Sequence, residues 1–351
     1  MRKFIKGIGI AISTVLISAF FVGCNSSKEV VNFLNYGENI DAETLKEFQK
    51  EYDIKVNVDT FDDMETMYNK IKSGAVNYDV ILVSDNLMGR MINEDLLLEL
   101  NKDNIPNINQ MSEEYLNLSM DPGNKYSVPY MFGTVGLIYN TDVVDEEVDS
   151  WDILWNEKYK DNIFMFNTYR DTIGAGLKKL GYSLNSENKD EIEEAKNLLL
   201  SQKKLGTIYG SDYGTESIAN GETVVNMIWS GEGLNLQDEY PNLKYVVPKE
   251  GANFWIDSLC IPKNAKNVEG AEKFINFVSD KESALRIADE IGYTTPNKEA
   301  MEAQEDHIKN NPNAYMPKEI MDRCELYNDL PKDIKKLYDE AWTEIGVESA
   351  D

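Results

Sequence analysis

Aromatic residues stand close to carboxylates at several points of this sequence, a pattern that suits the binding of an organic cation. Trp255 and Asp257 are two residues apart in an apolar segment. In an extended strand, residues i and i+2 point to the same face, so the indole and the carboxylate would lie together. Tyr36 and Glu38 repeat this spacing after an apolar run near the start of the chain. Each pair could present a ring and a negative charge to one ligand.

The chemistry of such a pair favours an ammonium group on a hydrocarbon chain. The ring face attracts a cation through its quadrupole, worth roughly 0.5–2 kcal/mol, and the carboxylate adds a charge-assisted hydrogen bond. Trp229, at the end of another apolar run, is followed three residues later by Glu232. In the alternative interpretation, Trp229 and Trp255 belong to the core and the acids lie on the surface. Spacing alone leaves both interpretations open.

Residues suited to catalysis are scarce. His307 is the single histidine, which excludes most histidine-based catalysis and metal sites with several histidines. The sequence contains no nucleophile-elbow, zinc-protease, Walker A or C-x-x-C motif. Cys260 lies in an apolar run and Cys324 beside an arginine, so we interpret both as structural thiols. We therefore expect no catalytic residues, no metal and no cofactor.

The charge of the chain points to the sign of its partner. It contains 62 acidic residues against 35 lysines and arginines, a net charge of −27. Such a surface repels phosphate backbones and attracts cations, so we expect no nucleic-acid partner. The length of 351 residues, 42% of them hydrophobic, suggests two domains at roughly 150 residues per domain.

The N-terminus has the pattern of an export signal. An uncharged run over 7–22 is too short for a membrane span and has the length of a signal core. It ends in Phe21-Val22-Gly23-Cys24, which resembles the lipobox of bacterial lipoproteins. We therefore predict a signal peptide over 1–23, a lipid on Cys24 and a tether over 24–30. The alternative is an ordinary secretory signal with an incidental cysteine. The run is preceded by the positive charges Arg2, Lys3 and Lys6.

Helix and strand patterns alternate after this segment and would position the aromatic and acidic pairs. The hydrophobic spacing predicts a strand over 31–34, a helix over 41–52, a strand over 54–58, a helix over 64–71 and a buried strand over 80–83. This order argues for a mostly parallel sheet flanked by helices. Open sheets of this kind bind ligands at the strand ends, where the aromatic–acid pairs occur. Further strands are expected at 137–139, 224–229 and 245–247, short helical turns at 151–159, and helices at 192–199, 271–278 and 334–345.

The chain resembles the spermidine/putrescine-binding proteins of bacterial polyamine ABC importers nearly end to end. The order and spacing of the matching blocks make the resemblance specific. The blocks are Asn35-Tyr36-Gly37-Glu38, Glu65-Thr66-Met67-Tyr68, Tyr126-Ser127-Val128-Pro129-Tyr130, Met227-Ile228-Trp229-Ser230-Gly231, Phe254-Trp255-Ile256-Asp257-Ser258-Leu259, Asn264-Ala265-Lys266-Asn267 and Ile291-Gly292-Tyr293-Thr294-Thr295-Pro296-Asn297.

The resemblance implies an α/β, two-lobed periplasmic-binding-protein fold of the type II kind, with the ligand in the cleft between the lobes. Lobe 1 would comprise 31–137 with 256–302, and lobe 2 would comprise 138–255 with 303–351. The absence of a low-complexity linker agrees with a chain that crosses between the lobes more than once.

The resemblance also implies roles for individual residues. Trp229, Trp255 and Tyr293 would form aromatic walls, with Tyr36 where the family usually has Trp. Asp257 and Glu38 would bind cations, with Asp171 where the family has Glu, and Ser84 would line the cleft. At other positions this sequence differs from the family. Gly37 stands where the family has Thr, and Asn39 and Asn86 each stand where it has Tyr. Thr168 replaces an Asp of the spermidine binder, and Tyr327 falls near a family Gln. Asp85 could supply the missing charge if it turns inward. Asn86, Thr168 and Tyr327 are further possible contacts.

These implications lead to a receptor without catalytic activity. It would bind a polyamine outside the cytoplasm and deliver it to a membrane permease driven by a separate ATPase. We expect a monomer held by a lipid at the outer face of the cytoplasmic membrane, or a periplasmic protein in an organism with an outer membrane. The alternatives are a receptor for another cationic or metal solute, such as thiamine or ferric iron, and, from other classes, a surface hydrolase or an adhesion protein.

Overall fold

The computed structural model describes residues 29–37, 39–210 and 213–346, and these contain one mixed sheet with helices on both faces. The predicted lipid site Cys24 and the predicted ligand residue Glu38 lie outside the described residues. The strand order is β2-β1-β3-β9-β4-β7-β5-β6, and β8 pairs with β4. The strands are β1 (Glu29–Tyr36), β2 (Ile54–Phe61), β3 (Val80–Ser84), β4 (Ser127–Asn140), β5 (Ile163–Phe166), β6 (Ile208–Gly210), β7 (Val225–Trp229), β8 (Leu243–Val246) and β9 (Phe254–Cys260).

The helices alternate with these strands, and the predicted order of strand, helix, strand, helix, strand at the start of the mature chain is confirmed. The α-helices are α1 (Ala42–Tyr52), α2 (Met64–Ser73), α3 (Asp85–Asn93), α4 (Tyr169–Lys179), α5 (Lys189–Lys203), α6 (Tyr213–Ala219), α7 (Ser230–Glu239), α8 (Val268–Val278), α9 (Lys281–Ile291), α10 (Lys298–Ala303), α11 (Asp306–Lys309), α12 (Lys318–Met321) and α13 (Lys332–Ile345). Short 3-10 turns occur at 102–104, 106–110, 113–115, 151–155 and 157–159, the last two where helical turns were predicted.

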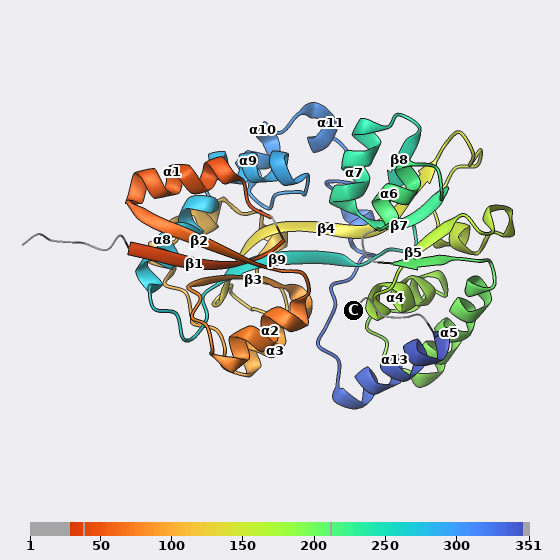
Figure 1. The fold of residues 1–351 in the computed structure, drawn as a ribbon, viewed down its shortest axis with the longest axis horizontal. Coiled ribbons are helices and arrows are strands. Elements are labelled where there is room, and N and C mark those ends of the chain that lie inside the picture. The colour runs from red at the N-terminus through yellow and green to blue at the C-terminus, as the bar shows by residue number, and fades with distance from the viewer. Residues whose placement is uncertain (1–28, 38, 211–212, 347–351) are drawn as a thin grey trace, which may run out of the picture.

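Two parallel sets of strands are joined by the antiparallel strands β4 and β9. β1 pairs in parallel with β2 and β3 in one half, and β5 pairs in parallel with β6 and β7 in the other. β4 pairs with β9 through its first part and with β7 through its second, so it runs through both halves. Figure 1 shows β4 and β9 passing between the two halves at the centre of the molecule. This arrangement gives the molecule two lobes and places the ends of several strands near its middle.

The strand β4 is longer than the pattern indicated, because it begins at Ser127 and contains both Pro129 and Gly133. Pro129 has no backbone N–H to give to a neighbouring strand, and prolines inside sheets concentrate at edges and bulges. The pairing register of β4 with β9 shifts between Pro129 and Met131. The irregularity therefore accommodates the proline, and the strand continues beyond it as the bridge between the halves.

Each half has its own hydrophobic core, which explains why the chain forms two lobes. Phe48 of α1, Phe274 of α8 and Ile287 of α9 pack on one face of β1–β3, and Met67 of α2 and Met88 of α3 pack on the other. The second half has a separate core, built around β5, β7 and the second part of β4 with α4, α5 and α13. The exact residues at which one lobe gives way to the other remain a prediction.

Local signals set several helix ends. Asp41 precedes α1 and accepts hydrogen bonds from the backbone N–H groups of Glu43 and Thr44, the N-cap that the sequence indicates. The C-terminal helix α13 docks on the second lobe, as its amphipathic pattern predicts, with Tyr338 fully buried. Within the residues that the structure covers, we find no helix with both the length and the apolar character needed to cross a membrane.

Candidate functional site

Asp257 and Ser84 face each other at the centre of the molecule. They are partners in the antiparallel pairing of β9 with β3, and the hydroxyl of Ser84 donates a hydrogen bond to the carboxylate of Asp257. Asp257 is 5% exposed. Burial raises its pKa to about 6, against the opposing effect of the Ser84 hydrogen bond. The site thus contains a buried acid that accepts a hydrogen bond from a hydroxyl group and has a raised pKa.

Asp85 begins α3 directly after Ser84 and is turned inward. It is 4% exposed. Its carboxylate accepts hydrogen bonds from the backbone N–H of Tyr327 at 2.9 Å and from that of Ile256 at 3.4 Å. Burial raises the pKa of Asp85 to about 7, and the neighbouring charge of Asp257 also raises it, against the lowering effect of these hydrogen bonds. Asp85 therefore lies beside Asp257 and ties β9 to the C-terminal segment.

An aromatic wall stands next to these acids. The rings of Trp255 and Tyr293 make an edge contact, with centroids 5.0 Å apart and an interplanar angle of 81°. The indole of Trp255 lies on Gly133, where a Cβ atom would come 2.5 Å from the ring. Its Nε1 atom is buried and has no hydrogen-bond partner among the described residues. Any side chain at position 133 would therefore collide with the indole in its present place.

Tyr293 connects this wall to α7. A Cβ atom on Gly231 would come 2.4 Å from the Tyr293 ring, so the ring packs directly on the first turn of that helix. Burial raises the pKa of the Tyr293 phenol well above its ordinary value, and the charges of Glu232 and Asp257 raise it further. Glu232 is thereby brought to the site, although the spacing of Trp229 and Glu232 was its only signal in the sequence. Tyr36, which also affects the pKa of Tyr293, lies close by.

Trp229 shares a sheet face with Trp255. Trp229 is opposite Val135 and Trp255 is opposite Gly133, on the two sides of β4. Because positions 133 and 135 point to the same face, and cross-strand partners point with them, both indoles emerge on one face. Trp229 also stacks on Phe166, with centroids 4.3 Å apart.

Asp171 forms a second acidic centre in the first turn of α4. Its carboxylate accepts hydrogen bonds from the Thr168 hydroxyl at 2.6 Å and from the Tyr327 hydroxyl at 3.0 Å. Burial raises the pKa of Asp171, while these two bonds and the nearby Arg170 oppose the increase. The guanidinium of Arg170 lies 4.4 Å from the centroid of the Tyr327 ring. Tyr327 thus connects the acidic centre at Asp171 with the one at Asp85 and Asp257. Its backbone N–H donates a hydrogen bond to Asp85, and its hydroxyl donates one to Asp171.

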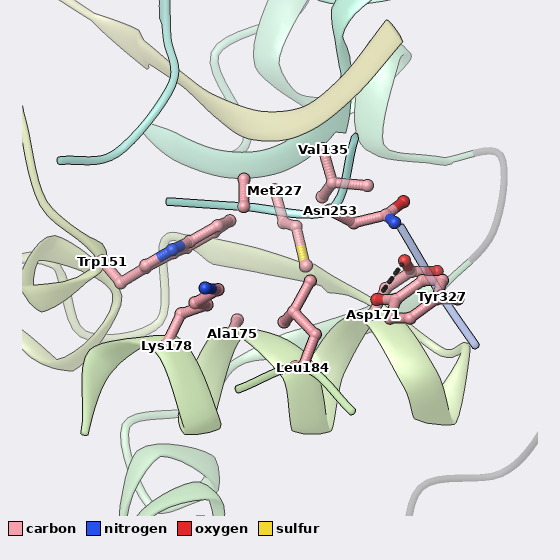
Figure 2. A pocket seen from close by; sticks show the side chains of 11 residues that line it. Val135, Trp151, Asp171, Ala175, Lys178, Leu184, Met227, Asn253 and Tyr327 are labelled. Atoms are coloured by element: carbon pink, nitrogen blue, oxygen red, sulfur yellow. Dashed lines mark hydrogen bonds between the residues drawn. The ribbon is translucent and has the colours of Figure 1, made fainter. Parts of the chain in front are cut away.

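Figure 2 shows Asp171 and Tyr327 at one end of a small cavity in the second lobe, which also includes Val135, Met227 and Asn253. The volume of this cavity that the centre of a water-sized sphere can occupy is only ≈ 10 Å³. That space holds about one water molecule. The cavity is therefore too small for an organic ligand, although Asp171 and Tyr327 line it.

The predicted site residues differ in how they are placed. Tyr36, half-buried at the end of β1, makes an edge contact with Phe61. Asn86 is exposed on α3, and Thr168 is exposed but hydrogen-bonded to Asp171. Among the described residues, no group of three or more His, Cys, Asp or Glu side chains could hold a metal ion. The residues brought together around Asp257 are Tyr36, Ser84, Asp85, Trp255 and Tyr293, and those around Asp171 are Thr168 and Tyr327.

Comparison with known proteins places the chain among binding proteins. Residues 43–317 match the family model described as "Bacterial extracellular solute-binding protein". The spermidine/putrescine-binding periplasmic protein of Salmonella typhimurium is 34% identical, over 91% of this chain and 92% of its own length. The corresponding Escherichia coli protein is also 34% identical, over 89% and 90%.

Solved structures agree with this placement. The spermidine/putrescine transporter substrate-binding protein PotD of Streptococcus pneumoniae has a TM-score of 0.85 and 36% identity, and the match covers 90% of this chain and 98% of that one. A putative spermidine/putrescine transporter protein of Listeria monocytogenes has a TM-score of 0.83, 36% identity and the same coverage. The predicted two-lobed α/β fold is confirmed. The chain belongs to the bacterial extracellular solute-binding proteins, in the family of the spermidine/putrescine-binding periplasmic proteins.

Proposed function

We propose that this protein is an extracytoplasmic receptor that binds a polyamine, spermidine or putrescine, and delivers it to an ABC importer. The observation that carries this proposal is the buried carboxylate of Asp257 beside the aromatic pair of Trp255 and Tyr293. A buried negative charge is costly without a partner. An ammonium group would supply that partner, and the methylene chain that follows it would pack on the rings.

Each predicted contact then has a role. The carboxylates of Asp257 and Asp171 accept hydrogen bonds from the ammonium groups of the ligand at the two acidic centres, and Glu38 adds a further carboxylate. Glu232, which faces Tyr293, is a candidate to be added to this set. Trp229, Trp255, Tyr36 and Tyr293 enclose the hydrocarbon chain. Ser84 orients Asp257, while Thr168 and Tyr327 orient Asp171.

The remaining parts of the proposal concern location and partners. The lobes comprise 31–137 with 256–302 and 138–255 with 303–351, and they close around the ligand. A lipid on Cys24 holds the monomeric receptor at the outer face of the cytoplasmic membrane, and a permease with its ATPase receives the ligand. The family consists of binding proteins, which agrees with a receptor that performs no chemical reaction.

Thermal unfolding of the purified receptor with a panel of solutes tests the proposal. Putrescine and spermidine should stabilise the protein by about 2.7 kcal/mol when present at 100 times the dissociation constant, because they bind only the folded state. Thiamine and ferric citrate serve as the alternative cationic and metal solutes. Stabilisation by one of these and by neither polyamine would contradict the proposal.

A further inference from the structure

Asp85 and Asp257 form a pair of buried acids that binding of a cation by Asp257 alone does not explain. Both side chains are at least 95% buried. Asp85 follows Ser84, which is paired with Asp257 across β3 and β9. The backbone N–H of Ile256, the residue before Asp257, donates to Asp85. The two carboxyl groups are thus close enough for the charge of Asp257 to raise the pKa of Asp85.

The described surroundings of this pair contain hydrogen-bond donors and aromatic rings. The carboxylate of Asp85 accepts hydrogen bonds from the backbone N–H groups of Tyr327 and Ile256. The carboxylate of Asp257 accepts one from the hydroxyl of Ser84. Neither acid makes an ion pair with a lysine or arginine in the part of the chain that the structure describes. The guanidinium of Arg170, near Tyr327, acts instead on Asp171, where it opposes the increase in pKa that burial causes. The phenols that face the pair are those of Tyr130 and Tyr293 near Asp257 and of Tyr327 near Asp85.

Two like charges buried together without a cation repel each other and are poorly solvated, so the pair gives up its second proton only at a higher pH than an exposed carboxyl group would. Two acids that interact strongly titrate as a unit. The pKa shifts of both acids have the direction that this repulsion requires. Burial raises the pKa of Asp85 to about 7 and that of Asp257 to about 6. A ligand ammonium would add the missing positive charge and favour the ionised form of both acids.

We propose that Asp85 is the second carboxylate of the cation subsite, that it shares a proton with Asp257 in the empty receptor, and that the ligand expels this proton on binding. The inference rests on the proposed function. The O–H bond of the carboxyl group breaks, the proton passes to the solvent, and the carboxylate that remains pairs with the ammonium group. The primary amines of both ligands stay charged across this range, because primary alkyl amines titrate well above neutral pH, near the value of about 10.4 for lysine. The affinity therefore rises with pH across the range in which the pair titrates.

Titration calorimetry of the full mature receptor with spermidine and putrescine measures this proton directly. The observed binding enthalpy in phosphate and in ACES buffer differs by the number of protons released times the difference in buffer ionisation enthalpy. We expect release of roughly one proton per ligand at about pH 6.5, and almost none at about pH 8.5. The Asp85→Asn variant keeps the shape of the protonated acid, and release at the lower pH should fall below about 0.3 proton.

Asp103→Asn, which replaces an exposed acid outside the candidate site, is the matched control and should release as many protons as the wild type. Binding of the wild type without proton release at the lower pH would overturn the proposal. Unchanged release in Asp85→Asn would overturn the role of Asp85 even if that variant bound more weakly. If Asp85→Asn did not fold, the two-buffer result on the wild type would still decide whether a proton is expelled. Absence of heat and of thermal stabilisation with either polyamine would instead defeat the proposed function.

Discussion

The hydroxyl of Ser84 donates a hydrogen bond to the carboxylate of Asp257, the residue directly opposite it in the pairing of β3 with β9. Ser84 occupies the N-cap position of α3, yet its side chain makes no capping hydrogen bond there. A serine at this position ordinarily satisfies the first backbone N–H groups of its helix. Here the hydroxyl instead fixes the orientation of the acid that we assign to the ligand. Position and chemistry both agree with our proposal that Asp257 binds the ligand.

Replacement of Asp257 by asparagine should weaken polyamine binding strongly. The variant keeps the shape of the side chain and removes the charge that pairs with an ammonium group, a loss of roughly 1.5–3 kcal/mol, or about 10- to 150-fold in affinity. Titration calorimetry at about pH 8 measures the change where the wild-type acid is ionised. Asp103→Asn is the control for an exposed acid. Affinity within twofold of the wild type would remove Asp257 from the binding site.

Replacement of Thr168 by aspartate should shift the preference toward spermidine. Spermidine has three amines and putrescine two, and each buried ammonium needs a partner. Thr168 offers a neutral hydroxyl, which already donates to Asp171. A carboxylate there would add charge for the third amine. Competition between the two ligands on the wild type, Thr168→Asp and the neutral control Thr168→Asn measures the ratio. The same ratio in all three proteins would mean that Thr168 does not contact the third amine.

Replacement of Gly231 by alanine should separate stability from binding. Alanine favours a helix over glycine by about 1 kcal/mol, but its Cβ atom would come 2.4 Å from the ring of Tyr293. The ring must move from its place beside Trp255, so we expect at least tenfold weaker binding with little loss of thermal stability. Gly89→Ala in α3 is the control, since its nearest contact would be at 3.9 Å. Unchanged affinity in Gly231→Ala would show that the position of Tyr293 does not matter for the ligand.

The stability of the empty receptor should depend on pH through Asp85. Its pKa in the folded state, about 7, exceeds its ordinary value of 3.8. The folded protein therefore binds a proton that the unfolded chain has lost, and this contribution to stability is complete below about pH 4 and disappears as the pH rises through about 7. Asp85→Asn, which cannot ionise, should gain stability relative to the wild type between about pH 5 and pH 8. Urea unfolding without ligand gives the difference, and an equal difference at both pH values would contradict the expectation.

Replacement of Cys24 by serine should release the protein from membranes or block its processing. The uncharged run that ends in Phe21-Val22-Gly23-Cys24 motivates this prediction. Fractionation of cells that express the wild type or the variant, with detection of the mature domain, is the measurement. Cys324→Ser, which alters a cysteine in the folded domain, is the control. Equal membrane attachment of Cys24→Ser and the wild type would exclude a lipid on this cysteine.

The sequence alone determined the features that depend on neighbours along the chain. Trp255 and Asp257 were expected on one face because a strand repeats every two residues, and both belong to β9. The alternation of helix and strand at the start and the cap at Asp41 follow from equally local rules. The matching blocks then gave the family, and with it the fold, which the comparisons confirm.

Only the tertiary structure decided which distant groups meet. Sequence spacing left open whether Asp85 turns inward, and the fold shows that it binds the backbone of Tyr327, 242 residues away. The resemblance places Tyr327 only near a family Gln, and the structure shows its hydroxyl reaching Asp171 across 156 residues. Such contacts depend on how the two lobes pack around β4 and β9. The partner of a buried acid is fixed by which strands and segments the whole chain brings beside it, and no local periodicity specifies that.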